Sequence, residues 1–292
     1  MSSDLYDYSA SEPEIPVKAI ESGLYIVATP IGNLADMSQR AIEMLRAADL
    51  VAVEDSRVTG KLLHHLGLKK RMRPYHDHSS EADRDSLLAA ACNGVVVLVS
   101  DAGTPLISDP GYKLVRAARE AGITVSTAPG PSAAIAALSI CGLPTDRFLF
   151  AGFLPSKAKA RADALAELAD VKTTLLFYES GPRLGASLQT MTEILGPREA
   201  VVARELTKKF EEVVSGSLPE LAARYAETGP KGEIVVIVGP PGEVQAEQGD
   251  YESALKIALE TLPPAKAAKD IAKRFGVDRA AVYERAMALK SD

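Results

Sequence analysis

The sequence predicts an α/β protein with two α/β domains and a small helical module at the C-terminus. Its 292 residues are about twice the usual domain length of roughly 150, so two domains are the starting expectation. Short runs of Val, Ile and Leu alternate with amphipathic stretches along most of the chain, as strands do with helices. The composition, 47% hydrophobic and 25% charged, is that of a globular protein and excludes a mostly disordered or fibrous chain.

The first predicted domain spans residues 21–143 and follows a polar, acidic leader at residues 1–20. Its strands are apolar throughout, which is typical of a largely parallel sheet covered by helices on both faces. The expected strands are Leu24–Thr29, Leu50–Glu54, Val95–Ser100 and Thr124–Ala128. The expected helices are Gln39–Ala48, Thr59–Leu66, Ala82–Ala91, Tyr112–Ala121 and Ser132–Leu138.

The second predicted domain covers residues 144–241 and begins where Cys141–Thr145 interrupts the alternation. Its expected strands are Phe148–Gly152, Thr174–Tyr178, Ala200–Ala203 and Glu233–Val238. Its expected helices are Ala158–Ala169, Leu184–Leu195 and Pro219–Glu227.

A linker at residues 242–250 separates this domain from a helical tail at residues 251–292. In the tail, Ala268, Ile271, Ala272 and Phe275 are spaced along one helical face, and Gly276 can supply the left-handed conformation that ends a helix. A second helical stretch follows, so the tail resembles a helix-turn-helix. A helical pair that stabilises a dimer is the alternative interpretation.

The cysteine spacing and the lack of a long apolar segment limit the kinds of protein that this chain can be. Cys92 and Cys141 stand alone without CxxC spacing, which favours a reducing compartment over a disulfide scaffold. Neither a secretory signal nor a membrane span is apparent, so we expect a cytoplasmic protein with no membrane partner. His76 and His78 would share one face of a strand, as metal ligands can, but no third ligand lies at useful spacing. We therefore expect no metal site.

Three loops rich in small residues follow predicted strands of the first domain. They are Thr29–Leu34, Ser100–Gly111 and Ala128–Ala134. In open α/β sheets, ligands bind beyond the carboxyl ends of the strands, and small residues let the backbone approach a ligand closely. Each loop alone could be a tight strand-to-helix turn, but three together favour a ligand cleft. None is a GxGxxG fingerprint or a P-loop.

These loops resemble those of the tetrapyrrole-methylase superfamily of S-adenosylmethionine-dependent methyltransferases. The resemblance runs from about Gly23 to Gly239, in the family's order, and covers most of the chain. Its matching stretches are Thr29–Leu34 with Asp36, Glu54-Asp55 with Arg57, Ser100–Gly111, Pro129–Ala133, Gly152–Pro155, Phe177–Ser180, Ala203–Lys208 and Lys231–Glu233. It implies two α/β domains of the tetrapyrrole-methylase type, with the cofactor cleft between them.

The resemblance is closest to the branch of this superfamily that methylates a ribose 2′-hydroxyl in 16S rRNA. It implies S-adenosyl-L-methionine as the cofactor, a homodimer, and a cytidine in the decoding region of the small ribosomal subunit as the target. By position, it assigns cofactor contacts to Pro30, Asp101, Ala102, Gly103, Thr104, Ile107, Ser132, Ala133, Tyr178, Leu206, Gly232 and Glu233.

A neutral ribose hydroxyl is a poor nucleophile, so a base or a cation that lowers its pKa would assist the reaction. The candidate catalytic residues are Glu54, Asp55, Arg57, Glu179, Arg204, Glu205 and Lys208. For Glu54–Arg57 and Arg204–Glu205, structural ion pairs are the alternative.

The charge distribution is compatible with an RNA partner, although the formal net charge is −6. Binding follows local patches rather than totals, and the tail holds eight Lys and Arg against six Asp and Glu. The candidate RNA contacts are Lys69, Lys70, Arg71, Arg73, Lys273, Arg274 and Arg279. We expect the loop with the first four of them to lie near the mouth of the cleft. A tetrapyrrole-precursor C-methyltransferase and a non-catalytic RNA-binding or assembly module are the competing interpretations.

Overall fold

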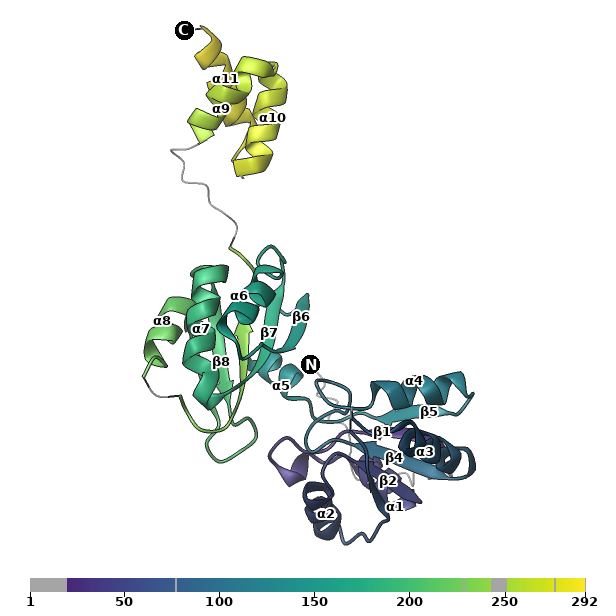
Figure 1. The fold of residues 1–292 in the computed structure, drawn as a ribbon. Helices are drawn as coiled ribbons and strands as arrows, with labels where there is room; N and C mark the ends of the chain where they lie inside the picture. The colour runs from purple at the N-terminus through teal and green to yellow at the C-terminus, as the bar shows by residue number, and fades with distance from the viewer. Residues whose placement is uncertain (1–19, 77, 228, 243–250, 276, 292) are drawn as a thin grey trace, which may run out of the picture. The chain divides into compact units, whose positions relative to one another are not determined.

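The computed structural model describes residues 20–76, 78–227, 229–242, 251–275 and 277–291 (Figure 1). They form two compact units, of which the first ends at Ala133 and the second begins at Ala134, rather than at the predicted boundary after residue 143. Most of the predicted leader (1–20), nearly all of the predicted linker (242–250) and the predicted helix stop at Gly276 lie outside the described residues.

The first unit contains a five-stranded sheet in which every neighbouring pair is parallel, as predicted. The strand order is β3-β2-β4-β1-β5. The strands are β1 (Gly23–Val27), β2 (Leu50–Val53), β3 (Met72–Pro74), β4 (Val95–Val99) and β5 (Val125–Ala128). Strand β3 was not predicted, because a three-residue edge strand preceded by basic residues carries no apolar run.

Helices cover both faces of this sheet, and the alternation of side chains along the strands explains why. Val51, Val53 and Val97 face one core with α1 (Gln39–Ala47) and α2 (Ser56–His65). Leu24, Val96 and Leu98 face the opposite core with α3 (Glu81–Asn93) and α4 (Tyr112–Glu120). Burying each such side chain contributes roughly 1.5–3 kcal/mol, so both faces of the apolar strands need a covering layer.

Helix α2 begins at Ser56, three residues before the predicted start. Asp55 explains the difference, because its side chain accepts a hydrogen bond from the backbone N–H of Arg57 and so caps the helix.

The second unit has a mixed sheet rather than a second parallel one, in the order β6-β7-β10-β8-β9. Strands β6 (Phe148–Phe153) and β7 (Thr174–Ser180) are parallel. Strand β10 (Glu233–Val238) is antiparallel to β7 and to β8 (Glu199–Arg204), and β8 is antiparallel to β9 (Glu212–Ser217). Strand β9, whose Glu and Ser residues suit an edge strand, was not predicted.

One hydrophobic core lies between this sheet and three helices, α6 (Ala158–Ala166), α7 (Gly181–Leu195) and α8 (Leu218–Arg224). Leu175 and Phe177 of β7 and Val236 of β10 are fully buried against α7 residues such as Leu188 and Met191. Helix α5 (Ala133–Ile140) precedes β6 in the chain. Because side chains alternate along a strand, the burial of Leu175 and Phe177 against the helices places the intervening residues of β7 on the other side of the sheet.

The C-terminal helices have a hydrophobic cluster of their own. They are α9 (Tyr251–Thr261), α10 (Pro264–Phe275) and α11 (Arg279–Ser291). The predicted apolar face of α10 is confirmed, since Ala268, Ile271 and Ala272 are buried together with Leu255 and Val282. In the described part of the chain, no helix combines the length and apolar character needed to span a membrane.

Candidate active site

The carboxyl ends of β1, β2, β4 and β5 meet at one edge of the first sheet, because all its strands run in the same direction. The structure thereby brings together the three predicted small-residue loops and the Glu54–Arg57 segment after β2. In the order of the strands, these segments are neighbours along the edge.

Hydrogen bonds connect the three loops of the first unit. Thr29 and Gly103 form an isolated antiparallel bridge, in which each backbone N–H donates to the other's carbonyl oxygen, at 2.9 and 3.0 Å. The Thr104 hydroxyl donates to the carbonyl oxygen of Pro131 at 3.0 Å. The loops after β1, β4 and β5 are therefore held in one arrangement.

The loop after β4 adopts backbone conformations that are rare for residues other than glycine. Gly103 has a φ of +78°, and Leu106 and Ser108 have φ values of +74° and +65°. For Leu106 and Ser108, such conformations cost roughly 1–3 kcal/mol each, and strain of this kind clusters at functional sites. Asp101, Ala102 and Ile107 of this loop are exposed, whereas Gly103 is buried by the bridge to Thr29.

Carboxylates are concentrated at the same edge. The backbone N–H of Asp101 donates to Glu54 Oε2 at 3.3 Å, and that of Asp55 donates to Asp101 Oδ1 at 3.0 Å. Burial, followed by the charges of Glu54 and Asp101, raises the pKa of Asp109 to about 6 against the opposing hydrogen bond from Ser100. Burial also raises the pKa of Asp101. The edge is thus an environment that favours a positively charged ligand.

Asp109 was not singled out by the sequence analysis, although it lies within the quoted stretch Ser100–Gly111. The signal that could have identified Asp109 was the position of its carboxylate in the loop that follows the apolar strand β4.

Asp55 and Arg57 form an ion pair, with 2.5 Å between Arg57 Nη2 and Asp55 Oδ2. Hydrogen bonds from Arg57 lower the pKa of Asp55 to about 2. Because Asp55 also caps α2, this arrangement favours the structural alternative for Asp55. The Arg57 side chain is 87% exposed and remains accessible to a ligand.

In the second unit, Glu179 is buried and satisfied by its neighbours. Its carboxylate accepts hydrogen bonds from the Ser187 hydroxyl at 2.5 Å and the Ser180 N–H at 2.9 Å, and its exposed fraction is 3%. Arg183 Nε lies 3.3 Å from Glu179 Oε1, an ion pair without hydrogen-bond geometry. The placement favours a role in positioning the β7–α7 junction over direct contact with a substrate.

Tyr178 precedes Glu179 and points to the other side of the strand. Its hydroxyl accepts a hydrogen bond from the Ala134 N–H at 3.3 Å, so β7 is joined to the start of α5. The rings of Phe150 and Phe153 pack edge-on against it, with centroids at 4.8 and 5.5 Å.

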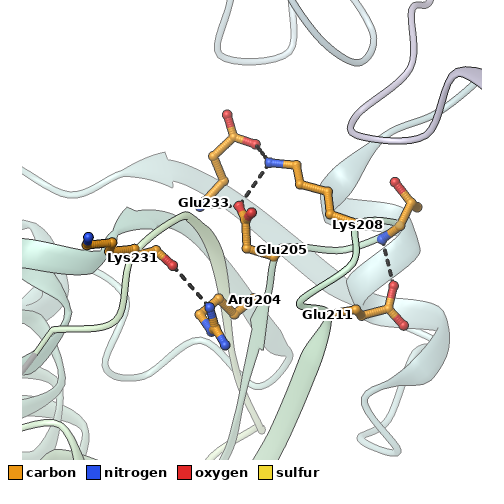
Figure 2. A network of polar contacts seen from close by, with 7 residues as sticks. Arg204, Glu205, Lys208, Glu211, Lys231 and Glu233 are labelled. Atoms are coloured by element: carbon orange, nitrogen blue, oxygen red, sulfur yellow. Dashed lines mark hydrogen bonds and ion pairs between the residues drawn. The ribbon is translucent and has the colours of Figure 1, made fainter.

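The predicted residues Glu205, Lys208 and Glu233 form one polar network, with Arg204 beside it (Figure 2). Lys208 Nζ donates to Glu205 Oε1 at 2.9 Å and to Glu233 Oε2 at 2.8 Å. The pKa of Glu205 is lowered, first by the hydrogen bond from Lys208 and then by that from the Glu233 N–H. Lys208 therefore joins the loop after β8 to the start of β10.

Arg204 has separate partners, which the sequence analysis missed. Its Nε donates to Glu212 Oε2 at 3.1 Å and its Nη1 donates to the Lys231 carbonyl oxygen at 3.2 Å. The predicted pair Arg204–Glu205 is therefore replaced by Arg204–Glu212 and Lys208–Glu205. Glu205 lies just beyond β8 and has a φ of +49°, so the side-chain alternation of the strand does not extend to it.

The basic loop before β3 does not lie near the carboxyl ends of the strands, and this expectation was wrong. Residues 69–71 precede β3, which runs parallel to β2, so they lie at the amino edge of the first sheet. Lys70 Nζ donates to the carbonyl oxygens of Arg46 and Ala48 at the end of α1, and Arg73 donates to the Ser86 hydroxyl. Lys69 and Arg71 are exposed.

In the C-terminal module, Arg279 is exposed, whereas the side chains of Lys273 and Arg274 lie outside what the structure describes. Among the described residues, no cluster of three or more His, Cys, Asp or Glu has an arrangement that could hold a metal ion.

Comparison with known proteins places these features in a family. Residues 23–222 match the family model described as tetrapyrrole (corrin/porphyrin) methylases, and residues 245–290 match the RsmI C-terminal HTH domain. The ribosomal RNA small subunit methyltransferase I of Erythrobacter litoralis is 55% identical over 286 residues, 98% of this chain and 99% of that protein. The chain belongs to the ribosomal RNA small subunit methyltransferase I family. The protein of that name from Mesorhizobium japonicum is 49% identical and covers 96% of both chains.

Solved structures share the fold of this small subunit methyltransferase I family member at low sequence identity. The uroporphyrin-III C-methyltransferase of Thermus thermophilus, complexed with S-adenosyl homocysteine, has a TM-score of 0.52 and 21% identity. It covers 74% of this chain and 97% of its own. A diphthine synthase has a TM-score of 0.59 and 17% identity, with 74% and 89% covered. The tetrapyrrole-methylase fold predicted from the loops is confirmed.

Proposed function

We propose that the chain transfers a methyl group from S-adenosylmethionine to the ribose 2′-hydroxyl of a cytidine in the decoding region of 16S rRNA. The observation that carries the proposal is the extent of the family resemblance. Relatives named for rRNA methylation match 96–98% of the chain, whereas the tetrapyrrole C-methyltransferase of Thermus thermophilus covers 74%. The tetrapyrrole-methylase family model matches residues 23–222 and ends before the C-terminal helical module, a feature that an RNA substrate explains and a small tetrapyrrole does not.

The chemistry of the first-unit edge fits S-adenosylmethionine. This cofactor carries a sulfonium and an ammonium group, and Glu54, Asp101 and Asp109 supply carboxylates for positive charge. The exposed backbone at Asp101–Ala102 and the hydroxyl of Ser132 suit its polar groups. The proposed cofactor contacts are those implied by the family: Pro30, Asp101, Ala102, Gly103, Thr104, Ile107, Ser132 and Ala133 from the first unit, and Tyr178, Leu206, Gly232 and Glu233 from the second.

When bound, the cofactor supplies a methyl group made electrophilic by its positively charged sulfur. The residues of this chain would position the ribose oxygen in line with that group, and positioning alone can supply up to about 7–11 kcal/mol of the barrier reduction. The hydroxyl would lose its proton as the new C–O bond forms and the methyl–sulfur bond breaks, and the sulfur would leave as a neutral thioether. We propose Asp109 as the carboxylate that accepts it, because it is half-buried in the loop after β4 that also carries Asp101, and its pKa of about 6 suits proton transfer near neutral pH.

The second unit and the C-terminal module would hold the RNA, together with exposed basic residues of the first unit. We assign the joined Lys208–Glu205–Glu233 cluster to shaping the second-unit loops, with Arg57 and Arg204 as partners for phosphate or ribose. Lys69, Arg71 and the basic residues of α10 and α11 are further RNA contacts in this proposal. A homodimer, implied by the family resemblance, and a cytoplasmic site of action complete it.

The proposal is tested by mapping ribose methyl groups in 16S rRNA by mass spectrometry, with and without the gene. The purified protein is also incubated with labelled S-adenosylmethionine and either 16S rRNA or small subunits, and the product nucleoside is identified. We expect 2′-O-methylcytidine at one decoding-region position. A methylated base, or methyl transfer to a tetrapyrrole precursor only, would refute the proposal. Cofactor binding without any transfer to RNA would favour an assembly module.

A further inference from the structure

An aromatic side chain lies exposed on the loop between β8 and β9. Phe210 is 65% exposed, and Lys209 Nζ lies 5.6 Å from the centroid of its ring. Burying a phenylalanine side chain contributes roughly 1.5–3 kcal/mol, which this position forgoes. An exposed aromatic ring beside a cation is the combination that proteins use to bind unpaired nucleotides.

The backbone around Phe210 is held in place by the network of Figure 2. Glu205 and Thr207 have φ values of +49° and +64°, although neither is a glycine. The Thr207 N–H donates to Glu211 Oε2 at 2.6 Å, and the Glu211 N–H donates to the Lys208 carbonyl oxygen at 3.2 Å. Leu206 is buried. The flanking residues are therefore fixed in a strained turn, while Lys209 and Phe210 are presented to solvent.

The same edge of the second sheet carries another exposed aromatic residue and another exposed cation. Strands β6, β7 and β8 run in one direction, because β6 and β7 are parallel and β10 is antiparallel to both β7 and β8. Phe153 ends β6 and is 57% exposed, and Lys231, just before β10, is exposed. The edge at which the predicted site residues collect thus also carries Phe153, Lys209, Phe210 and Lys231.

Most carboxylates at this edge are paired with cations, so they repel an anionic ligand less than unpaired carboxylates would. Glu205 and Glu233 share Lys208, and Glu212 is paired with Arg204. Neither Lys209 nor Lys231 has a carboxylate partner among the described residues. Their charges are available for phosphate.

We propose that Phe210 and Lys209, with Lys231, bind an unpaired segment of the RNA substrate. A base stacks on the Phe210 ring, and phosphates next to it are contacted by the two lysines. This inference rests on the proposed function and adds residues for substrate binding that the family resemblance did not assign. Stacking requires only a base face, so it would hold a single strand without reading its sequence.

The test measures RNA binding by fluorescence anisotropy with a short labelled single-stranded RNA and with a 16S rRNA transcript. Phe210→Ala should weaken binding by about 5- to 150-fold, the usual effect of losing one base–aromatic stack, and Phe210→Trp should restore it. Lys209→Ala with Lys231→Ala should flatten the plot of log K against log[salt] by about 0.7 per lost phosphate contact. S-adenosylmethionine affinity, measured by calorimetry, should not change in any of these variants.

Matched controls come from the opposite edge of the same sheet. Phe148 begins β6 and is exposed, and Lys172 is exposed just before β7. Phe148→Ala and Lys172→Ala should leave RNA affinity unchanged, with thermal unfolding recorded for every variant.

Two outcomes would overturn the inference. One is a folded Phe210→Ala variant that binds RNA as tightly as the parent protein while the parent methylates 16S rRNA; only the inference then fails. The other is a variant that loses self-association in sedimentation but keeps its RNA affinity, which would assign Phe210 to a contact between copies of the chain. A parent protein that binds and methylates no RNA would refute the proposed function together with the inference.

Discussion

Thr29 and Gly103 exchange two backbone hydrogen bonds, of 2.9 and 3.0 Å, although they follow different strands of the first sheet. The bridge extends the contact of β1 with β4 beyond the sheet and into the loops. Small changes in one loop are therefore transmitted to the other. The proposed cofactor residues Pro30 and Asp101 each lie beside one of the bridged residues.

Replacing Gly103 by Ala should reduce both stability and cofactor affinity. The added Cβ has room, since its nearest neighbour would be Ile31 Cγ2 at 3.5 Å, but the φ of +78° is unfavourable for alanine. We expect a loss of about 1–2 kcal/mol in the free energy of unfolding. Gly122→Ala is the control, because Gly122 has a φ of +70°, open space around it and no place at the loops. Equal S-adenosylmethionine affinities for the two variants, measured by calorimetry, would contradict the cofactor assignment.

Replacing Asp109 by Asn should increase stability at neutral pH. The folded protein raises the pKa of Asp109 to about 6, so it holds the proton more tightly than the unfolded chain does. This contribution to stability is complete below the ordinary aspartate pKa of about 3.9 and is lost as the pH rises through about 6. Urea unfolding should thus show the variant to be more stable than the parent near pH 7, and the difference should vanish near pH 4. Asp85→Asn, at an exposed position on α3, should show no such trend.

Replacing Glu179 by Gln should affect folding as well as turnover. The carboxylate is buried and accepts two hydrogen bonds, so losing its charge should cost about 1.5–3 kcal/mol of unfolding free energy. Glu193→Gln, on the exposed side of α7, should cost little. Unfolding and single-turnover methyl transfer are measured on the same samples. Parent-like stability with a tenfold slower transfer would instead support the catalytic role expected from the sequence.

Lys69 and Lys70 should respond differently to replacement by Met. Lys70 donates hydrogen bonds to two carbonyl oxygens at the end of α1, and its replacement should lower the free energy of unfolding by about 1–2 kcal/mol. Lys69 is exposed, so its replacement should change stability by less than about 0.5 kcal/mol. If the loop contacts RNA, the Lys69 variant should instead flatten the salt dependence of binding by about 0.7. Equal stabilities in chemical unfolding would argue against the Lys70 contacts.

Strands β1, β2 and β4 of the first sheet were predictable because they are almost wholly apolar and a helix follows each of them. The second sheet was less predictable, because the sequence of a buried apolar strand does not show whether the strand runs parallel or antiparallel to its neighbours. Strand direction there depends on β10, which pairs between β7 and β8 although it comes last in the sequence. Strands β3 and β9 lie at sheet edges, where one flank needs no apolar partner, and their composition resembles that of loops.

The loops of the candidate site were found from their small residues, but their partners were not. Nothing in the sequence joins Arg204 to Glu212 or Glu179 to Ser187, because these pairs depend on strand register and helix phase. The basic loop at 69–71 was misplaced for a similar reason: without β3, its position before a strand rather than after one was not apparent.

The position of β1 between β4 and β5 has a consequence for synthesis of the chain. All five residues of β1 are buried in the finished sheet, yet both of its neighbours are made later. At about 5–20 residues per second, roughly 5–20 seconds separate the emergence of β1 from that of β5. During that interval an apolar segment waits in the nascent chain without its partners, where a chaperone or the ribosome surface would shield it. Polar substitutions within Leu24–Val27 would remove this apolar surface from the nascent chain, but they would also remove side chains that the finished sheet buries.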